Sequence, residues 1–375
     1  IKKLSNYNYR IIFPDDTYIT LCEDLILKNN LLYKKTLDKK TIENLLKENE
    51  YFILGDNREI SLDSHIFGPV TKENIQGVTT HLRKKVIEKG GDPDRECLKL
   101  IPAIDGNLYF LDSEGEYWRS YQFITDSSAY DKAESAEDFY QSAIAFGTFQ
   151  CLLADYPTHT LYETIPGFHD TRARYKVFNS AVSADICQRA AHVQKEIEFV
   201  RQHEHIIRCF GELQDNGQLP LRVTHNDTKI NNVLFHPDDN SAMIVIDLDT
   251  VMPGLIGHDF GDAIRFAANT AAEDEKDLSK VSFDITMFDA YAKGFLESCG
   301  DSLTEQEVRL LPMGALTMTL ECGMRFLTDY LQGDIYFKTH REDHNLDRCR
   351  TQFKLVEDME NQWEQMNSIV LKYCK

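Results

Sequence analysis

The order of the predicted elements along the chain constrains its fold more than any other feature of the sequence. In residues 1–125, short runs of β-branched and aromatic residues are separated by Gly, Asp and Asn, a pattern typical of strands and turns. From residue 260 onward, apolar residues recur at helical spacing over long stretches. Strands followed by a run of helices predict an α+β fold, with a small sheet-bearing lobe and a large helical lobe.

The individual elements follow from hydrophobic periodicity and from turn residues. Strands are predicted at 10–13, 17–21, 51–54, 97–103, 108–111, 117–124, 232–235 and 242–247. Helices are predicted at 38–49, 72–89, 136–153, 185–202, 260–270, 283–298, 304–331 and 344–370. The composition changes near residue 70, from a segment rich in Asn, Lys and Ile to an ordinary one, which indicates two segments of different character.

Composition excludes several classes of partner. The chain has 41 Lys and Arg against 61 Asp and Glu, a formal net charge of −20, and is therefore not expected to bind nucleic acid or an anionic membrane surface. No uninterrupted apolar stretch approaches the roughly 18 residues of a transmembrane helix. The nine cysteines form no Cys-x-x-Cys pair. We interpret them as free thiols in a reducing compartment, and a cytoplasmic location is expected.

One polar segment carries groups suited to phosphoryl transfer. His225-Asn-Asp-Thr-Lys-Ile-Asn-Asn232 fits the H-x-D-x-x-x-x-N pattern of a kinase catalytic loop. In that pattern Asp227 accepts the proton of an acceptor hydroxyl, and Lys229 reaches the phosphoryl group in transfer. Asn232 binds Mg²⁺ through its amide oxygen, a hard ligand of the kind that this ion prefers. We interpret His225 as a residue that braces the loop.

A second metal ligand is expected at the end of a strand. The run Met243-Ile-Val-Ile-Asp247 predicts a buried strand that delivers the Asp247 carboxylate at its carboxyl end. Asp249 would lie on the same side of an extended strand, either as another metal ligand or as a hydrogen-bond acceptor that supports the site.

A literal copy of another kinase motif lies further along the chain. Asp259-Phe-Gly261 spells the magnesium-binding tripeptide of protein kinases, but no buried strand leads into it. We therefore interpret Asp259 and Asp262 as residues that order the loop and cap the helix that follows.

From about residue 71 to the end, the chain resembles the aminoglycoside phosphotransferase/choline kinase-like superfamily, and within it the N-acetylhexosamine 1-kinases. The resemblance rests on several motifs spread over this part of the chain. They are Gly90-Gly-Asp-Pro-Asp-Arg95, Tyr117-Trp-Arg119, Glu163-Thr-Ile-Pro166, Phe168-His-Asp170, His225-Asn-Asp-Thr-Lys229, Val245-Ile-Asp-Leu-Asp-Thr-Val-Met-Pro-Gly254, Met324-Arg-Phe-Leu-Thr-Asp-Tyr330 and Gly333-Asp-Ile-Tyr-Phe-Lys338.

This resemblance implies a protein-kinase-like bilobal fold and transfer from ATP, with Mg²⁺, to the anomeric 1-hydroxyl of GlcNAc or GalNAc. Asp227 would be the base that faces this hydroxyl, while Asn232 and Asp247 would hold Mg²⁺. Arg325 and Tyr336 would contact the sugar, since an Arg fork and a Tyr hydroxyl suit sugar hydroxyls and an acetamido carbonyl. The implied partners are ATP and a small sugar.

The resemblance also implies where the adenine lies. By analogy with kinase hinges, it would meet backbone groups just after the strand at 117–124, at Gln122, Phe123 and Ile124. His169 and Asp170 are further candidates for the sugar site.

The first segment resembles a different family. Gly55-Asp-Asn-Arg58, Asp63-Ser64 and Phe67-Gly-Pro-Val70, together with Ser61, are similar to the C-terminal box of bacterial type I signal peptidases. Those enzymes use a Ser–Lys dyad upstream of this box, and no such region precedes it here. Their Arg after Asp-Ser is replaced by His65. Peptidase activity is therefore not expected.

The predicted domains are a signal-peptidase-like fragment at 1–70, a partial kinase N-lobe at 71–125 and a kinase C-lobe at 126–375. The kinase family begins with strands that carry a glycine-bearing loop over the ATP phosphates. Before residue 70 the chain has only Gly55 and Gly68, so this loop is not recognised and the N-lobe is expected to be incomplete.

Several alternatives stay open at this point. The join could be a natural fusion, an engineered chimera or a wrongly joined gene. The acceptor could be an aminoglycoside, choline or homoserine, as for other kinases of the superfamily. The chain could also be a binding module that is inactive because it lacks the phosphate-binding loop.

Overall fold

The computed structural model describes residues 2–5, 8–12, 18–22, 64–111 and 117–374. The chain divides into two units, Ile1–Ile53 with Tyr121–Thr125 and Leu54–Ser120 with Asp126–Lys375. The helix predicted at 38–49, the strand predicted at 51–54 and the signature residues from Gly55 to Asp63 lie outside the described residues.

The first unit contains a small antiparallel sheet in the order β1-β2-β3. Its strands are β1 (Lys2–Ser5), β2 (Asn8–Ile12) and β3 (Tyr18–Cys22). In the β2–β3 register Ile11 faces Ile19, and Tyr9 faces Leu21. The strands predicted at 10–13 and 17–21 are thus confirmed within two residues at each end.

The second unit opens with the long helix α3 (Ser64–Glu88). The sequence predicts this helix only from residue 72, because Gly68-Pro69 is a pair that usually breaks helices. The buried Asn74 on α3 donates from Nδ2 to the carbonyl oxygens of Tyr162 and Val251, at 2.8 and 3.0 Å. Its Oδ1 accepts the N–H of Tyr162 at 2.9 Å. Every polar group of this amide is therefore used to join α3 to the segments at Tyr162 and Val251.

Short strands follow the short helix α4 (Pro93–Glu96). They are β4 (Leu100–Ile101), β5 (Phe110–Leu111), β6 (Tyr117–Trp118) and β7 (Ser120–Tyr121). β5 pairs antiparallel with β6, so that Phe110 faces Trp118. The strands predicted here exist but are shorter than predicted.

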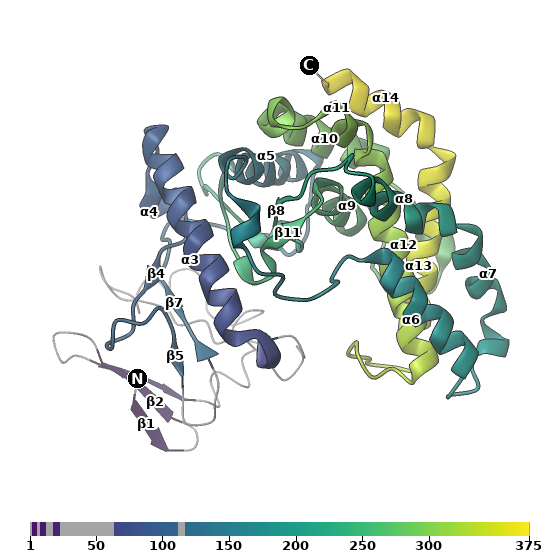
Figure 1. The fold of residues 1–375 in the computed structure, drawn as a ribbon, viewed down its shortest axis with the longest axis horizontal. Helices are drawn as coiled ribbons and strands as arrows, with labels where there is room; N and C mark the ends of the chain where they lie inside the picture. Colours follow the sequence, from purple (N-terminus) through teal and green to yellow (C-terminus); the bar gives the residue numbers. More distant parts are fainter. Residues whose placement is uncertain (1, 6–7, 13–17, 23–63, 112–116, 375) are drawn as a thin grey trace. The chain divides into compact units, whose positions relative to one another are not determined.

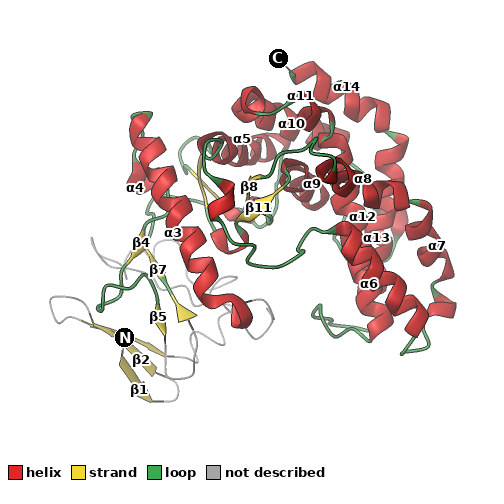
Figure 2. Ribbon diagram, in the orientation of Figure 1, coloured by secondary structure: helices red, strands yellow, loops and turns green. Residues whose placement is uncertain are grey.

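The rest of the second unit is mainly helical (Figures 1 and 2). Its α-helices are α5 (Ala136–Leu152), α6 (Thr171–Ala184), α7 (Gln194–Gln202), α8 (Glu204–Asp215), α9 (Ile256–Ala267), α10 (Ile285–Cys299), α11 (Glu305–Arg309), α12 (Leu311–Gln332), α13 (His344–Asn361) and α14 (Trp363–Tyr373). The predicted α+β fold with a helical C-terminal lobe is confirmed. Among the described residues, no helix has the length and apolar character needed to span a membrane.

Helix α12 forms the centre of this lobe, with α13 running beside it (Figure 1). Almost all of its residues are buried, as expected for a helix that is covered on every side. It packs on α9 at very short range, since a Cβ on Gly261 would lie 2.2 Å from the carbonyl oxygen of Gly314. This close approach fixes α9, and α9 in turn carries residues that hold the catalytic loop.

One helical region differs from the prediction. The helix predicted at 185–202 is instead the end of α6 at Ala184, a 3₁₀ turn η2 (Ala190–His192) and α7. Asp185, at the C-cap of α6, has a φ of 38°, in the left-handed region that ends helices. The sequence also gives no prediction of α6 or α8.

Candidate active site

Two small antiparallel pairs frame the predicted catalytic loop. β8 (Arg222–Thr224) pairs with β11 (Met252–Gly254), and β9 (Val233–Phe235) pairs with β10 (Ala242–Val245). The loop leaves β8, passes through the 3₁₀ turn η3 (Ile230–Asn232) and enters β9. The polar residues of the motif are thus held between two buried pairs of strands.

The anchor of this loop is Asp259, which the sequence interpretation placed in the wrong role. Asp259 lies inside the first turn of α9, whose N-cap is Leu255 with no side-chain cap bond. Its Oδ2 accepts the backbone N–H of His225 and its Oδ1 that of Asn226, both at 2.8 Å. Gln150 also donates to Oδ2, at 2.9 Å. Asp259 therefore does order the loop, but it does so as a buried acceptor and does not cap the helix.

Asp262, one turn further along α9, also holds the loop and does not cap the helix. Its Oδ2 accepts the N–H of Thr228 at 3.2 Å, and its Oδ1 accepts Arg265 at 2.9 and 3.1 Å. Burial disfavours its charge, but Arg265 and Lys229 outweigh burial and lower the pKa of Asp262. The sequence signal for these anchors was two acids at a spacing of three on an apolar helix.

His225 braces the loop, as the sequence predicts. Its ring is buried, and Nε2 lies 2.9 Å from the carbonyl oxygen of Ile246. The rings of Phe146 and Phe149 meet it edge-on, with centroids 5.4 and 5.9 Å away. A ring fully used in this way is a support for the loop.

The structure brings Asp227, Lys229 and Asn232 together. Lys229 Nζ lies 2.6 Å from Asp227 Oδ1, and Asn232 Nδ2 donates to Asp227 Oδ2 at 3.0 Å. Asn232 Nδ2 also donates to the backbone carbonyl of Asp227 at 2.8 Å. Burial disfavours the charge on Lys229, but the carboxylates of Asp227 and Asp262 raise its pKa above the usual value. The result is a half-buried carboxylate beside a permanent positive charge.

Asn232 and Asp247 have a chemistry that fits Mg²⁺. The amide nitrogen of Asn232 faces Asp227, so its amide oxygen is the atom left to bind a cation. The N–H of Ile246 donates to the backbone carbonyl of Asn232 at 2.9 Å, which brings the residue before Asp247 next to Asn232. Asp247 has a φ of 59°, so the chain turns sharply after β10. One amide and one carboxylate suffice from the protein when nucleotide phosphates complete the coordination.

Asp249 has a partner that the sequence interpretation did not foresee. It lies in the 3₁₀ turn η4 (Leu248–Thr250) and forms an ion pair with Arg119. Arg119 belongs to the Tyr117-Trp-Arg119 motif, which the sequence left without a role.

Arg325 and Tyr336 also lie near one another. The Arg325 guanidinium carbon is 5.8 Å from the centre of the Tyr336 ring, and Phe168 and Phe337 flank it at 5.6 and 5.5 Å. Asp329, one turn after Arg325 on α12, accepts the backbone N–H groups of residues 335, 336 and 337 at 2.8–3.0 Å. These bonds fix the loop that carries Tyr336.

His169 and Asp170 have separate roles. Asp170 is the N-cap of α6 and accepts the N–H of Ala173 at 2.9 Å. His169 Nδ1 lies 3.0 Å from Glu321, a buried carboxylate that also accepts Thr171 Oγ1 at 2.6 Å. His169 thus lies one turn from Arg325 on α12 through Glu321, whereas Asp170 is used by its helix.

The residues predicted to meet adenine belong to the first unit. Gln122, Phe123 and Ile124 follow β7. Ile124 is buried and Phe123 is partly exposed. Their role as adenine contacts stays a prediction.

Comparison with known proteins agrees with these two resemblances. The profile of a family described as "Phosphotransferase enzyme family" matches residues 100–292. A profile described as "Signal peptidase, peptidase S26" matches residues 8–82.

Solved structures share the fold at low sequence identity. An aminoglycoside phosphotransferase from Alicyclobacillus acidocaldarius is 12% identical with a TM-score of 0.55, over 87% of this chain and 92% of that one. A microcompartment-associated aminopropanol kinase is 13% identical, with a TM-score of 0.49 over 86% and 91% of the two chains. A choline kinase from Cryptosporidium parvum is 11% identical, with a TM-score of 0.47 over 100% and 92%. Because the phosphotransferase profile covers more than half of the sequence, the chain belongs to the phosphotransferase enzyme family.

Proposed function

We propose that the chain is an ATP- and Mg²⁺-dependent kinase that phosphorylates the anomeric 1-hydroxyl of an N-acetylhexosamine, GlcNAc or GalNAc. The observation that carries the proposal is the Asp227 carboxylate, held at 2.6 Å by Lys229 and at 3.0 Å by Asn232. A carboxylate held in this way can orient a hydroxyl and receive its proton. Membership of the phosphotransferase family supports the reaction class.

The reaction is a direct in-line transfer. The sugar O1 forms a bond to the γ-phosphorus of ATP as the bond from that phosphorus to the β,γ-bridging oxygen breaks, giving ADP and a sugar 1-phosphate. The O1 proton passes to Asp227 and later to solvent. Lys229 lies beside Asp227, where its ammonium can stabilise negative charge on the transferred group. Mg²⁺, held by Asn232 and Asp247, would supply neutralisation of the phosphate charge.

The proposed acceptor site lies at Arg325 and Tyr336. The Arg325 guanidinium lies among three aromatic rings from two loops, an arrangement that limits its movement. Its donors suit sugar hydroxyls and an acetamido carbonyl, and the Tyr336 hydroxyl can donate or accept. A fixed cation at this position disfavours the cationic acceptors choline and aminoglycosides.

The test is ADP release with Mg-ATP and a panel of acceptors: GlcNAc, GalNAc, choline, homoserine and an aminoglycoside. Turnover with the two amino sugars alone is expected. Arg325→Met should raise KM for the sugar by at least about tenfold, with KM for ATP little changed, because a charged hydrogen bond to the substrate is lost. Arg309→Met, which removes a surface ion pair with Glu305, is the matched control and should change neither constant.

Two results would contradict the proposal in different ways. Turnover with choline or an aminoglycoside, and none with amino sugars, would leave a phosphotransferase with a different acceptor. Absence of turnover with any acceptor, together with no binding of Mg-ATP in calorimetry, would indicate the inactive alternative. Micromolar to sub-millimolar binding of Mg-ATP would exclude that alternative.

A further inference from the structure

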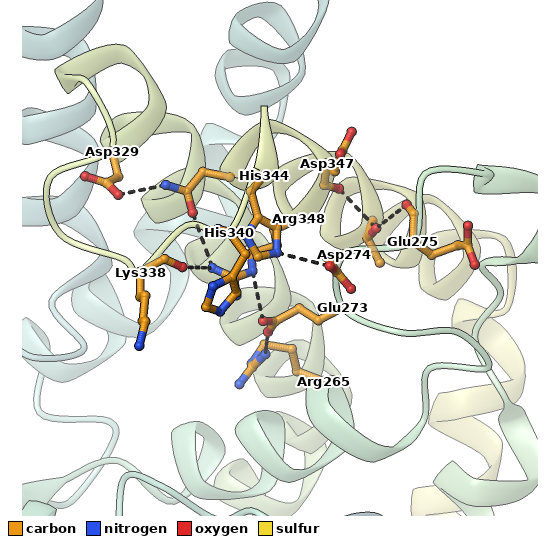
Figure 3. A network of polar contacts seen from close by, with 12 residues as sticks. Arg265, Glu273, Asp274, Glu275, Asp329, Lys338, His340, His344, Asp347 and Arg348 are labelled. Atoms are coloured by element: carbon orange, nitrogen blue, oxygen red, sulfur yellow. Dashed lines mark hydrogen bonds and ion pairs between the residues drawn. The ribbon is translucent and has the colours of Figure 1, made fainter. Parts of the chain in front are cut away.

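A chain of charged side chains runs between the two loops that the proposed function uses, with Glu273 at its middle (Figure 3). Glu273 lies in the segment between α9 and α10. Its Oε1 lies 3.0 Å from Nη1 of Arg265, and its Oε2 lies 3.7 Å from Nε of Arg348 on α13. One carboxylate is thus shared by two arginines from two different helices.

On one side, this chain reaches the catalytic loop. Arg265 is almost fully buried, and its other partner is Asp262. Asp262 accepts the N–H of Thr228, the residue between Asp227 and Lys229. A buried arginine with two carboxylate partners is sensitive to the loss of either, because its charge is then left incompletely compensated.

On the other side, the chain reaches the loop that carries Tyr336. Arg348 Nη1 donates to the carbonyl oxygen of Lys338 at 3.3 Å and meets Asn345 Oδ1 at 3.5 Å. Asn345 Nδ2 donates to Asp329 at 2.8 Å and to Asp334 at 2.9 Å. Asp329 is the residue that accepts the three backbone N–H groups at 335–337.

We propose that Glu273 is a positioning residue that couples the acceptor loop at 334–338 to the transfer loop at 225–232 by bridging Arg265 and Arg348. The naming of these loops as acceptor and transfer loops rests on the proposed function, whereas the bridge itself does not. Its effect is to hold the proposed sugar-binding tyrosine in register with the base Asp227, since small misplacements of substrate are costly in rate. A continuous set of contacts alone does not establish coupling, so the proposal depends on a direct measurement.

The first measurement is hydrogen exchange, which needs no substrate. Glu273→Ala should speed amide exchange both at 335–337 and at Thr228, by roughly 2- to 30-fold, the range expected for coupling of this kind. Glu273 is partly exposed, so its removal leaves no core cavity. Arg350→Met is the matched control, because Arg350 lies on the same helix and pairs with Glu196 at 2.6 Å, away from both loops. Faster exchange at only one loop, or an equal response in the control, would overturn the proposal.

The second measurement is a double-mutant cycle in steady-state kinetics. Glu273→Ala and Arg348→Met should each raise KM for the acceptor, or lower kcat, by roughly 2- to 30-fold, with KM for ATP little changed. The double variant should be no worse than the more affected single variant, because both substitutions break the same bridge. Additive effects, or a loss of thermal stability with unchanged kinetic constants, would overturn the positioning role.

The two proposals fail separately. A wild-type chain that phosphorylates none of the acceptors defeats the proposed function, and the exchange experiment still decides whether Glu273 couples the loops. A wild-type chain active on amino sugars whose two loops respond independently to Glu273→Ala defeats only the coupling.

Discussion

The carboxylate of Asp259 accepts the backbone N–H of Asn226 at 2.8 Å and so fixes the residue directly before Asp227. Asn226 has a φ of 64°, in the left-handed region that Asn tolerates better than most residues. Its own side chain donates to the carbonyl oxygen of Thr250 at 2.9 Å. The backbone is thereby held from two sides at the point where the chain turns toward the proposed base.

Asp259→Asn should reduce stability more than activity at the remaining folded sites. An Asn places a donor against the N–H of His225 or Asn226, so at least one buried donor loses its acceptor. The expected loss is about 3 kcal/mol in the free energy of unfolding, measured by urea denaturation. Asp238→Asn, at an exposed turn, is the control and should change the midpoint little. An unchanged midpoint in Asp259→Asn would show that this anchor is dispensable.

Asp227→Asn should have the opposite profile. The variant keeps the size of the side chain and removes the charge that receives the proton, so kcat should fall by roughly 10²- to 10⁴-fold. The side chain is 28% exposed, so the unfolding midpoint should hardly move. ADP release and thermal unfolding on the same samples give both numbers. Retained turnover would exclude Asp227 as the base.

The metal site predicts a specific dependence on Mg²⁺. Asn232→Ala and Asp247→Asn should each raise the Mg²⁺ concentration for half-maximal rate by at least about tenfold, the loss that even supporting residues of metal sites produce. Asn231→Ala is the neighbouring control, because Asn231 is exposed. A titration of rate against Mg²⁺ at fixed ATP makes the comparison. Equal Mg²⁺ dependence in all three variants would contradict the assignment.

Glu321 predicts how stability changes with acid. Burial disfavours its charge, but the hydrogen bond and charge of His169, with Arg325 and Thr171, lower its pKa from 4.5 to about 2. A lowered carboxyl pKa stabilises the fold above the unfolded value, and this contribution is lost as pH falls from about 5 to 2. Glu321→Gln should therefore cost about 3 kcal/mol at neutral pH. The difference from wild type should shrink in acid, as followed by urea midpoints across pH. Parallel curves for the two proteins would refute this.

The proposed catalytic residues could be predicted from sequence because their signal is local. Asp227, Lys229 and Asn232 fall within one loop, and Asp247 ends an apolar strand, so spacing alone brings them together. The role of Asp259 depends on α9 packing against the loop from a distance in sequence, which no spacing rule contains. Its resemblance to a known tripeptide gave no correct guide.

The helices show the same distinction between local and tertiary causes. α12 is apolar throughout and was predicted as part of one long segment, whereas α6 buries only Thr171, Phe178 and Ala181 and gives weak periodicity. The contact of Arg325 with three rings, and the bonds from Asp329 to residues 335–337, required the positions of α12 and its following loop. The sequence placed Arg325 and Tyr336 in one site through family resemblance alone.

The course of α3 bears on how the two family segments can be exchanged. The predicted boundary at 70/71 falls inside this helix, and the signal-peptidase profile ends within it. Modules joined by a flexible linker tolerate insertions, but a shared helix transmits them as rotation. One added residue between Val70 and Asn74 would turn the first turns of α3 by about 100° about the helix axis relative to the Asn74 clamp. A recombinant that replaces residues 1–63 with another leader must therefore preserve helical phase as well as sequence.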